Sequence, residues 1–291
     1  MAVLPHNKQP NKIWVGTEGD GLILYDISTK TYVEYKNVPT PQNSISSNFI
    51  RSLEYDSEGC LWIGTFMGLN VTCDDYTFHR YYSKQQNPQT ISQNSIRSIC
   101  RDTQGGMWFG AYFGGVNYHH KKLNRFINYT QTADNSLGDN IVSAMFADKD
   151  GKIWIGTNEN GLDCFDKKSN TFKHYKHDPK QQYSIPGNNV KAILKHSDHV
   201  FFIGLHSAGL CLFDTSSEKF TNVNFTHPNG YNNSVYALEK GENNQLYIGT
   251  LDGLFQFDIT TGQSRQIKTD QNGKKLPNIG IFALLKDKKG N

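Results

Sequence analysis

Long hydrophobic runs are absent from this 291-residue sequence, and so are blocks of charge of one sign. No apolar stretch reaches the roughly 20 residues that a helix needs to cross a bilayer. The first ten residues, MAVLPHNKQP, lack the apolar core of a signal peptide. The net charge is +3 and both signs are mixed along the chain, so no basic tract is available for a phosphate backbone. We therefore expect no nucleic-acid partner and no contact of this chain itself with a membrane.

Cysteine is scarce: there are five, an odd number, and no two form a CxxC pair. This spacing favours neither a disulfide framework nor a zinc site, so we expect small apolar side chains on strands. A bridge between Cys164 and Cys211 stays open, because both lie at a similar point of the repeat described below. Motifs such as HExxH, GxSxG and the Walker loop are also absent. We expect no catalytic residue, no metal and no cofactor.

Glycine and aromatic residues are plentiful instead, with 26 glycines and 12% aromatic residues. This composition is typical of a β-protein with many turns. No segment of helical length shows a sustained apolar period of 3.6 residues, which argues against an α/β fold.

An internal repeat of about 46 residues is the dominant signal. An aromatic residue, an aliphatic residue and a glycine recur together, and the six copies begin at Trp14, Trp62, Trp108, Trp154, Phe202 and Tyr247. A second glycine before an aliphatic residue follows each copy, and then an aromatic pair three residues apart in four of them. A short alternating apolar segment precedes each copy after the first, at 50–56, 96–102, 142–148, 190–196 and 235–241, and recurs at 281–287. An Asp-x-x-Gly turn joins the two segments in three copies.

One repeat therefore predicts four short strands joined by Gly, Asp and Asn turns. A sheet of that size cannot bury both faces alone, but it can when copies stack radially, so we predict an all-β fold, a β-propeller of four-stranded antiparallel blades. The aromatic residue should fill the layer between neighbouring blades, and the glycine should allow a close approach of the next blade. A β-solenoid would need a much shorter repeat.

The boundaries follow from the repeat. We expect a tail or linker at 1–10 and a single propeller domain at 11–291, with repeats at about 11–59, 60–105, 106–151, 152–199, 200–244 and 245–291. Residues 279–288 would supply the innermost strand of the blade that residues 12–36 complete. The six blades would then close through one blade shared by both ends. The alternative is a fragment of a seven-bladed propeller.

The combined pattern resembles the two-component regulator propeller repeat. The copies that carry it best are NSISSNFIRSLEYDSEGCLWIGTFMGLN, QTISQNSIRSICRDTQGGMWFGAYFGGVN and NSLGDNIVSAMFADKDGKIWIGTNENGLDCFD, and the resemblance covers nearly the whole chain. It implies the periplasmic, glycan-sensing region of a hybrid two-component histidine kinase of Bacteroidetes. In such sensors two propellers, usually of seven blades, precede a β-sandwich, a membrane helix and the kinase.

The same resemblance implies the partners. They are an oligosaccharide or other small ligand, a second propeller or sandwich domain of the parent sensor, and a second copy in a homodimer. This chain departs from the pattern, because it carries about six repeats and neither a sandwich, a membrane span nor a kinase motif. We therefore interpret it as a fragment of such a sensor or as a stand-alone relative.

The loops after each aromatic strand differ in every copy while the framework around them repeats, which is how a repeat protein builds a distinct site. Aromatic faces beside amides and carboxylates suit a sugar. The candidate ligand-binding residues are Glu18, Phe66, Tyr112, Phe113, Asn158, Glu159, His206 and Asp252. By contrast, we expect structural roles for the recurring asparagines Asn48, Asn94, Asn140, Asn188 and Asn233.

Three functions remain open. The first is a non-enzymatic sensor propeller that binds a ligand. The second is a propeller lyase or glycosidase, for which His206 with Glu159 or Asp252 is the only candidate constellation. The third is a structural spacer that carries protein interactions.

Overall fold

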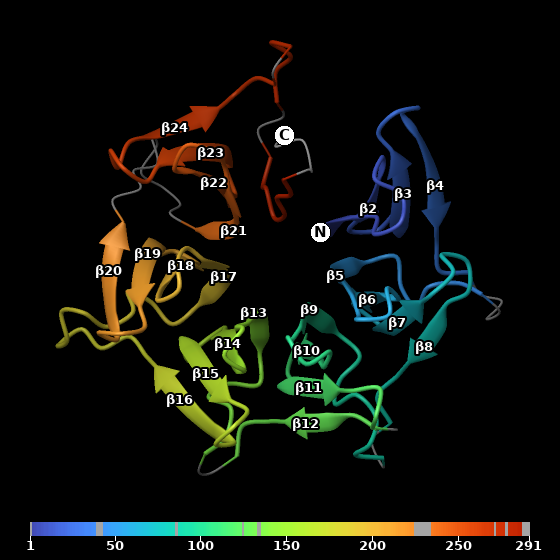
Figure 1. Cartoon of the computed structure of the whole chain (residues 1–291), viewed down its shortest axis with the longest axis horizontal. Helices are drawn as coiled ribbons and strands as arrows, with labels where there is room; N and C mark the ends of the chain where they lie inside the picture. The colour runs from blue at the N-terminus through green and yellow to red at the C-terminus, as the bar shows by residue number, and fades with distance from the viewer. Residues whose placement is uncertain are drawn as a thin grey trace. The chain divides into compact units, whose positions relative to one another are not determined.

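The computed structural model describes residues 2–38, 43–84, 87–123, 125–132, 135–223, 234–270, 272–276 and 279–286. These residues form 24 β-strands in six antiparallel sheets of four strands each, and neighbouring strands follow one another along the chain. Within these ranges there is no helix, and hence none that could span a bilayer. The fold is a β-propeller with six four-stranded blades, as the repeat predicts (Figure 1).

The chain divides into two compact units, and the first comprises Met1–Ile155 and Asp163–Lys173. Its four sheets are built from β1 (Ala2–Pro5), β2 (Lys12–Gly16), β3 (Leu22–Asp26) and β4 (Thr31–Tyr35); β5 (Ile50–Tyr55), β6 (Leu61–Thr65), β7 (Gly68–Thr72) and β8 (His79–Tyr81); β9 (Ile96–Arg101), β10 (Met107–Ala111), β11 (Val116–His119) and β12 (Ile127–Tyr129); and β13 (Val142–Ala147), β14 (Lys152–Thr157), β15 (Leu162–Asp166) and β16 (Thr171–Tyr175).

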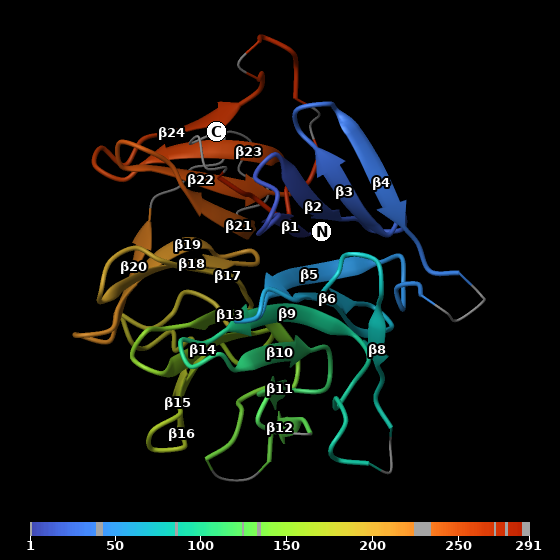
Figure 2. The same cartoon turned by 45° about the vertical axis from the view of Figure 1, so that its right-hand side comes forward.

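The second unit comprises Gly156–Leu162 and His174–Asn291, so it takes in the loop between β14 and β15. Its two sheets are built from β17 (Val190–Lys195), β18 (Val200–Leu205), β19 (Gly209–Asp214) and β20 (Lys219–Val223), and from β21 (Val235–Lys240), β22 (Gln245–Thr250), β23 (Gly253–Asp258) and β24 (Ser264–Ile267). In both units the first strands of consecutive blades lie side by side, as β5 and β9 do in Figure 2.

The recurring tryptophans pack between consecutive blades of the first unit. The ring of Trp62 lies 5.1 Å from the ring of Phe109 in the next blade, and that of Trp108 lies 5.7 Å from Phe165. Trp14 shares a buried cluster with Leu61 and other side chains of the second blade. Each large buried side chain contributes about 1.5–3 kcal/mol of stability. The predicted packing of the aromatic strand is therefore confirmed.

The glycine after each aromatic residue is required by this packing. A Cβ atom on Gly16 would lie 2.5 Å from the Cγ2 of Ile50, the first residue of the next inner strand. A Cβ atom on Gly110 would lie 2.5 Å from the Cγ1 of Val142, and one on Gly204 would lie 2.6 Å from Val235. No real Cβ contact is that short, so only glycine fits here.

The Asp-x-x-Gly turns do more than close a hairpin. The Oδ1 of Asp56 accepts a hydrogen bond from the amide of Glu58, two residues on, as predicted. Its Oδ2 also accepts from the indole Nε1 of Trp62 at 3.0 Å, and Asp102 accepts from Trp108 at 2.9 Å. The turn therefore fixes the orientation of the tryptophan that packs on the next blade.

The recurring asparagines are structural, as predicted, and they position the variable loops. In each described case the side-chain oxygen accepts from a backbone amide at the start of the inter-blade loop, as Asn94 does from Ser83 at 2.7 Å. The backbone carbonyl of the same residue accepts from the glycine that ends the preceding blade's variable loop, as Asn94 does from Gly68 at 2.8 Å. The residues are Asn48, Asn94, Asn140 and Asn188, while Asn233 lies outside the described residues.

The prediction of a tail at residues 1–10 is wrong. Residues 2–5 form β1, which pairs with β2 from Ala2↔Gly16 to Pro5↔Ile13. The first blade therefore takes its inner strand from the N-terminus, and the predicted blade shared with residues 279–288 does not form. The sequence AVLP is shorter than the repeated inner strands and lacks their turn, so the pattern did not mark it.

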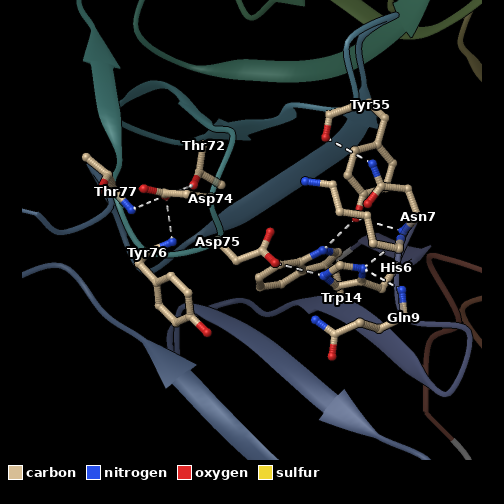
Figure 3. Close-up of polar contacts among 12 residues, drawn as sticks. His6, Asn7, Gln9, Trp14, Tyr55, Thr72, Asp74, Asp75, Tyr76 and Thr77 are labelled. Atoms are coloured by element: carbon tan, nitrogen blue, oxygen red, sulfur yellow. Dashed lines mark hydrogen bonds and ion pairs between the residues drawn. The ribbon is translucent and has the colours of Figure 1, made fainter.

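His6 secures this N-terminal strand (Figure 3). Its side chain is fully buried and stacks on Trp14, with ring centroids 5.8 Å apart. Its Nδ1 accepts from the amides of Lys8 and Gln9, so its Nε2 carries the proton that is donated to Asp75 at 3.0 Å. No Asp-x-x-Gly turn precedes Trp14, and its Nε1 donates instead to the hydroxyl of Tyr55 at 2.8 Å.

Residues 281–286 form no strand, although they continue the repeat. The amide of Ile281 donates to the carbonyl of Thr250 at 2.8 Å, as the amide of Ile50 donates to that of Thr17. A Cβ atom on Gly249 would lie 2.9 Å from the Cγ2 of Ile281. Ile281 thus contacts the last blade in the same way as Ile50, the first residue of an inner strand, contacts the blade before it.

The expectation that cysteines form no disulfide is wrong for one pair. Cys60 and Cys73 are bonded, with Cα atoms 4.1 Å apart. They lie one residue beyond the paired residues Leu61 and Thr72, so the β6–β7 hairpin brings them together. The other three cysteines are free and buried, as expected of apolar side chains, and the bridge left open between Cys164 and Cys211 is not formed.

Candidate functional site

A β-bulge at the second residue of the inner strand marks the site. In the second blade Ile50 pairs with Thr65 and Ser52 pairs with Gly64, so Arg51 is left without a partner residue. The same shift occurs in three other blades. There the unpaired second residues are Arg97, Lys191 and Tyr236. A bulge takes a side chain out of the regular alternation of the strand. These four side chains are thus re-aimed at the strand end that carries the variable loops.

In the first unit the bulge residues contact three of the predicted loop residues, and a fourth, Phe113, packs on one of these. The Nη1 of Arg51 lies 3.7 Å from the Oε1 of Glu18, and its guanidinium lies 5.8 Å from the ring centre of Phe66. The guanidinium of Arg97 lies 4.5 Å from the ring centre of Tyr112, whose ring lies 4.4 Å from that of Phe113. Together with Phe49, whose ring lies 6.3 Å from that of Phe66, we name these residues the arginine–aromatic cluster.

The guanidinium groups of Arg51 and Arg97 are two positive charges close enough to affect each other. Burial lowers the pKa of Arg97, and the positive charge of Arg51 lowers it further. The Nε atoms of both arginines are buried and have no hydrogen-bond partner within the described part of the chain. Among the described residues, Arg97 forms no ion pair with a carboxylate, and the face of Tyr112 is its compensating contact.

The backbone of Phe113 adopts the left-handed conformation. Its φ is 62°, and among the described non-glycine residues with positive φ it is the only aromatic one. Its side chain is nevertheless 63% exposed. A bulky residue in the left-handed region costs stability, and such strain gathers at binding sites. The strain therefore supports a functional role for this loop.

In the second unit the bulge residues also contact residues of the variable loops, but the side chains are different. The Nζ of Lys191 donates to the Oδ1 of Asn158 at 3.0 Å. The Nδ1 of His206 lies 3.1 Å from the hydroxyl of Tyr236 and 3.0 Å from that of Ser234. The ring of Tyr236 lies 5.1 Å from that of Phe282, at the equivalent position of the last segment.

The remaining two predicted residues do not join His206. Asp252 lies on the β22–β23 turn, at the rim of a cavity of about 620 Å³ lined by Leu254, Leu276 and Ile281. Glu159 lies in the β14–β15 loop. Among the described residues, the hydrogen-bond partners of His206 are the hydroxyls of Ser234 and Tyr236 rather than either carboxylate named for a lyase or glycosidase.

The bulge residues were missed in the sequence, although a signal was present. The inner strands begin with Ile or Val and continue with Ser or Ala at the third position, while the second position changes in almost every copy. It holds Arg51, Arg97, Ser143, Lys191, Tyr236 and Phe282. This position therefore varies among the copies as the loop residues do.

The two component regulator propeller family model matches residues 44–67, 90–113 and 136–159. These three segments are two-component regulator propeller repeats. Each match runs from an inter-blade loop through the inner strand to the variable loop, so the matched segments include Arg51, Phe66, Arg97 and Tyr112. The resemblance predicted from the sequence is confirmed.

Two similar proteins belong to two-component systems by their descriptions. Histidine kinase P4 of Formosa agariphila is 42% identical over 59 residues, which are 20% of this chain and 4% of that protein. The extracellular domain of BT3049 from B. thetaiotaomicron, assigned to the hybrid two component systems, superposes with a TM-score of 0.82 at 24% identity, covering 99% of this chain and 37% of that one. The chain thus spans well under half the length of both.

A propeller enzyme shares the fold as well. Virginiamycin B lyase from Staphylococcus aureus has a TM-score of 0.67 at 14% identity, covering 92% of this chain and 84% of the lyase. At such identities a structural likeness concerns the fold alone, because one propeller scaffold serves many functions.

Proposed function

We propose that this chain is a non-enzymatic, ligand-binding propeller from the extracytoplasmic part of a two-component sensor, and that its ligand is an oligosaccharide. One observation carries the proposal: two sets of variable side chains, from the loops and from the bulges, contact each other on a framework that otherwise repeats. Repeated residues maintain the fold, so residues that vary at one end of the blades are free to serve recognition.

The chemistry of the arginine–aromatic cluster fits a sugar. The exposed rings of Phe66 and Phe113 offer apolar faces for the C–H surface of a pyranose. The guanidinium groups and the carboxylate of Glu18 offer donors and acceptors for hydroxyls. Sites for small ligands combine apolar faces with a few fixed polar groups in this way.

The cellular setting belongs to the same proposal. The Cys60–Cys73 disulfide supports an oxidising compartment such as the periplasm of a Bacteroidetes cell. In the parent sensor, the propeller would contact a second propeller, a sandwich domain or a second copy of itself. Ligand binding would then signal by shifting the equilibrium between two arrangements of these partners.

Calorimetry against a panel of oligosaccharides tests the proposal. We expect one class to bind with a measurable affinity, and the double variant Tyr112→Ala/Phe113→Ala to weaken it at least about tenfold, because two ring faces are lost. Tyr32→Ala is the matched control, since this ring is also exposed but lies on the outer strand β4. Absence of binding across the panel would favour the spacer, and cleavage of a polysaccharide would favour a propeller lyase or glycosidase.

A further inference from the structure

Two half-buried arginines lie together in the first unit, and the Nε atom of each has no hydrogen-bond partner among the described residues. Arg51 and Arg97 occupy the same bulge position of β5 and β9, whose chains pack side by side. Arg80 provides a comparison, because it is an arginine of the same unit and is also half-buried. Its Nε donates to the carbonyl of Ser44 and its Nη2 to the hydroxyl of the same residue. By contrast, the Nε atoms of Arg51 and Arg97 donate to nothing among the described residues.

The local charge is also unbalanced. The cluster holds two guanidinium groups and one carboxylate, that of Glu18, whose side chain is 50% exposed and lies 3.7 Å from Arg51. That distance is longer than a hydrogen bond, so the ion pair between Glu18 and Arg51 is a weak one. Placing two like charges near each other in a partly buried site costs free energy unless an anion offsets it.

The aromatic residues hold one guanidinium in position. The ring of Tyr112 lies against Arg97 at 4.5 Å and is itself held by the edge of Phe113. Stacking uses the face of a guanidinium and leaves the two Nη groups at its edge for a ligand, whereas the Nε is buried. An N–H edge of this kind matches the two oxygens of a carboxylate or sulfate in a bidentate contact.

From these observations we infer that Arg51 and Arg97 together bind the anionic group of an acidic oligosaccharide, either a carboxylate or a sulfate. The inference rests on the proposed function and narrows its ligand to sugars that carry negative charge. Tyr112 positions Arg97, and the exposed ring of Phe113 contacts the sugar that bears the anion.

Matched ligand pairs provide the test. Oligogalacturonides are compared with their carboxyl-reduced forms, and sulfated galactan oligosaccharides with their desulfated forms, by calorimetry on the whole chain. We expect one charged form to bind at least about tenfold more tightly than its neutral counterpart, with an affinity that falls as salt rises. Arg97→Gln and Arg51→Gln should each remove most of this preference.

Arg101→Gln is the matched control, because Arg101 lies on the same strand but at its far end, where it donates to the carbonyl of Asp56. It should leave the preference unchanged. Arg97→Lys, which keeps the charge but not the flat N–H edge, should retain part of it. The ligand pairs and the salt series need only the wild-type chain, so they decide the question even where a variant folds poorly.

The outcomes are distinct. Equal binding of charged and neutral forms would overturn the inference and leave the proposed function standing, as would a charge preference that survives both arginine substitutions. Failure of every charged and neutral oligosaccharide to bind would overturn the proposed function and the inference with it.

Discussion

Substitution of Asp102 by asparagine should destabilise the first unit far more than the same change at Asp56. Both residues open an Asp-x-x-Gly turn and accept from the tryptophan of the next strand. Only Asp102 also accepts from a lysine, the Nζ of Lys167 at 2.5 Å. The Asp102 side chain is 1% exposed and that of Lys167 is 16% exposed, so this ion pair is largely shielded from water.

The size of the effect follows from the contacts that the substitution breaks. An asparagine amide placed at Oδ2 would face the N–H of Trp108 and the ammonium of Lys167, so the indole would lose its acceptor and Lys167 would keep only the side-chain oxygen of Gln104. An unsatisfied buried donor costs about 1–3 kcal/mol. Loss of one partner of a buried ion pair costs about 3–5 kcal/mol, and less here because Lys167 can reach solvent. We expect a loss of about 3–5 kcal/mol for Asp102→Asn, and about 1–2 kcal/mol for Asp56→Asn, which loses one donor contact.

The pH dependence provides a second readout. Burial alone would raise the pKa of Asp102, but hydrogen bonds from Lys167, Trp108 and the amide of Gly106 outweigh it and lower the pKa. A carboxyl whose pKa is lowered by folding stabilises the fold above the pKa of the unfolded chain, about 3.9 for Asp. That stabilisation is lost as the pH falls through the lower, folded value. The gap in stability between the wild type and Asp102→Asn should therefore be constant near neutral pH and shrink below about pH 4.

Urea denaturation followed by tryptophan fluorescence measures both effects. All four tryptophans lie in the first unit, so the signal reports on the unit that contains both aspartates. Equal losses of unfolding free energy for the two variants would refute the reasoning, because they would show that the ion pair with Lys167 contributes nothing. A gap between wild type and Asp102→Asn that does not change down to pH 2.5, about 1.4 units below the unfolded pKa, would refute the linkage argument.

Two further predictions use the same assay. The disulfide closes a segment with a sequence separation of 13, so Cys60→Ala/Cys73→Ala should lower the free energy of unfolding by about 3 kcal/mol. A reductant should destabilise the wild type but not this variant, and a wild type insensitive to reductant would contradict the bond. Gly110→Ala should cost about 1–3 kcal/mol, because the new methyl group would clash with the Oγ of Ser98 and lie 2.5 Å from the Cγ1 of Val142. Val142→Ala should relieve part of that cost, so strictly additive effects would argue against the contact.

The repeat predicted those parts of the fold whose environment recurs. Trp62 and Trp108 face equivalent neighbours, and the glycines after them meet the next inner strand in the same way. The first strand has no such equivalent, because β1 is held by His6, a residue with no counterpart in the other blades. The disulfide was missed for a different reason. Its two cysteines become neighbours only when the register Leu61↔Thr72 is known, and their spacing in the sequence does not show it.

The candidate site was half predictable. Variation among the loops pointed to Phe66 and Tyr112, and both contact the arginine of the inner strand in their own blade. The sequence does not distinguish the arginines from ordinary strand positions, because an alternating pattern cannot show that one residue is extra. A bulge is visible only in the pairing with the neighbouring strand, and this pairing depends on the folded sheet.

The bulge also explains how the site can change while the fold stays the same. Ile96 packs against Gly64 of the preceding blade, and Arg97 follows it directly in the chain. The buried side chain of Ile96 fixes where the backbone of Arg97 lies. Because of the bulge, the side chain of Arg97 takes no part in the packing between strands. A substitution at this position therefore alters the charge and shape of the ligand surface without removing a core contact. For that reason the loss of anion preference expected for Arg97→Gln should come with little change in unfolding free energy, whereas the same loss through general destabilisation would show in the urea midpoint.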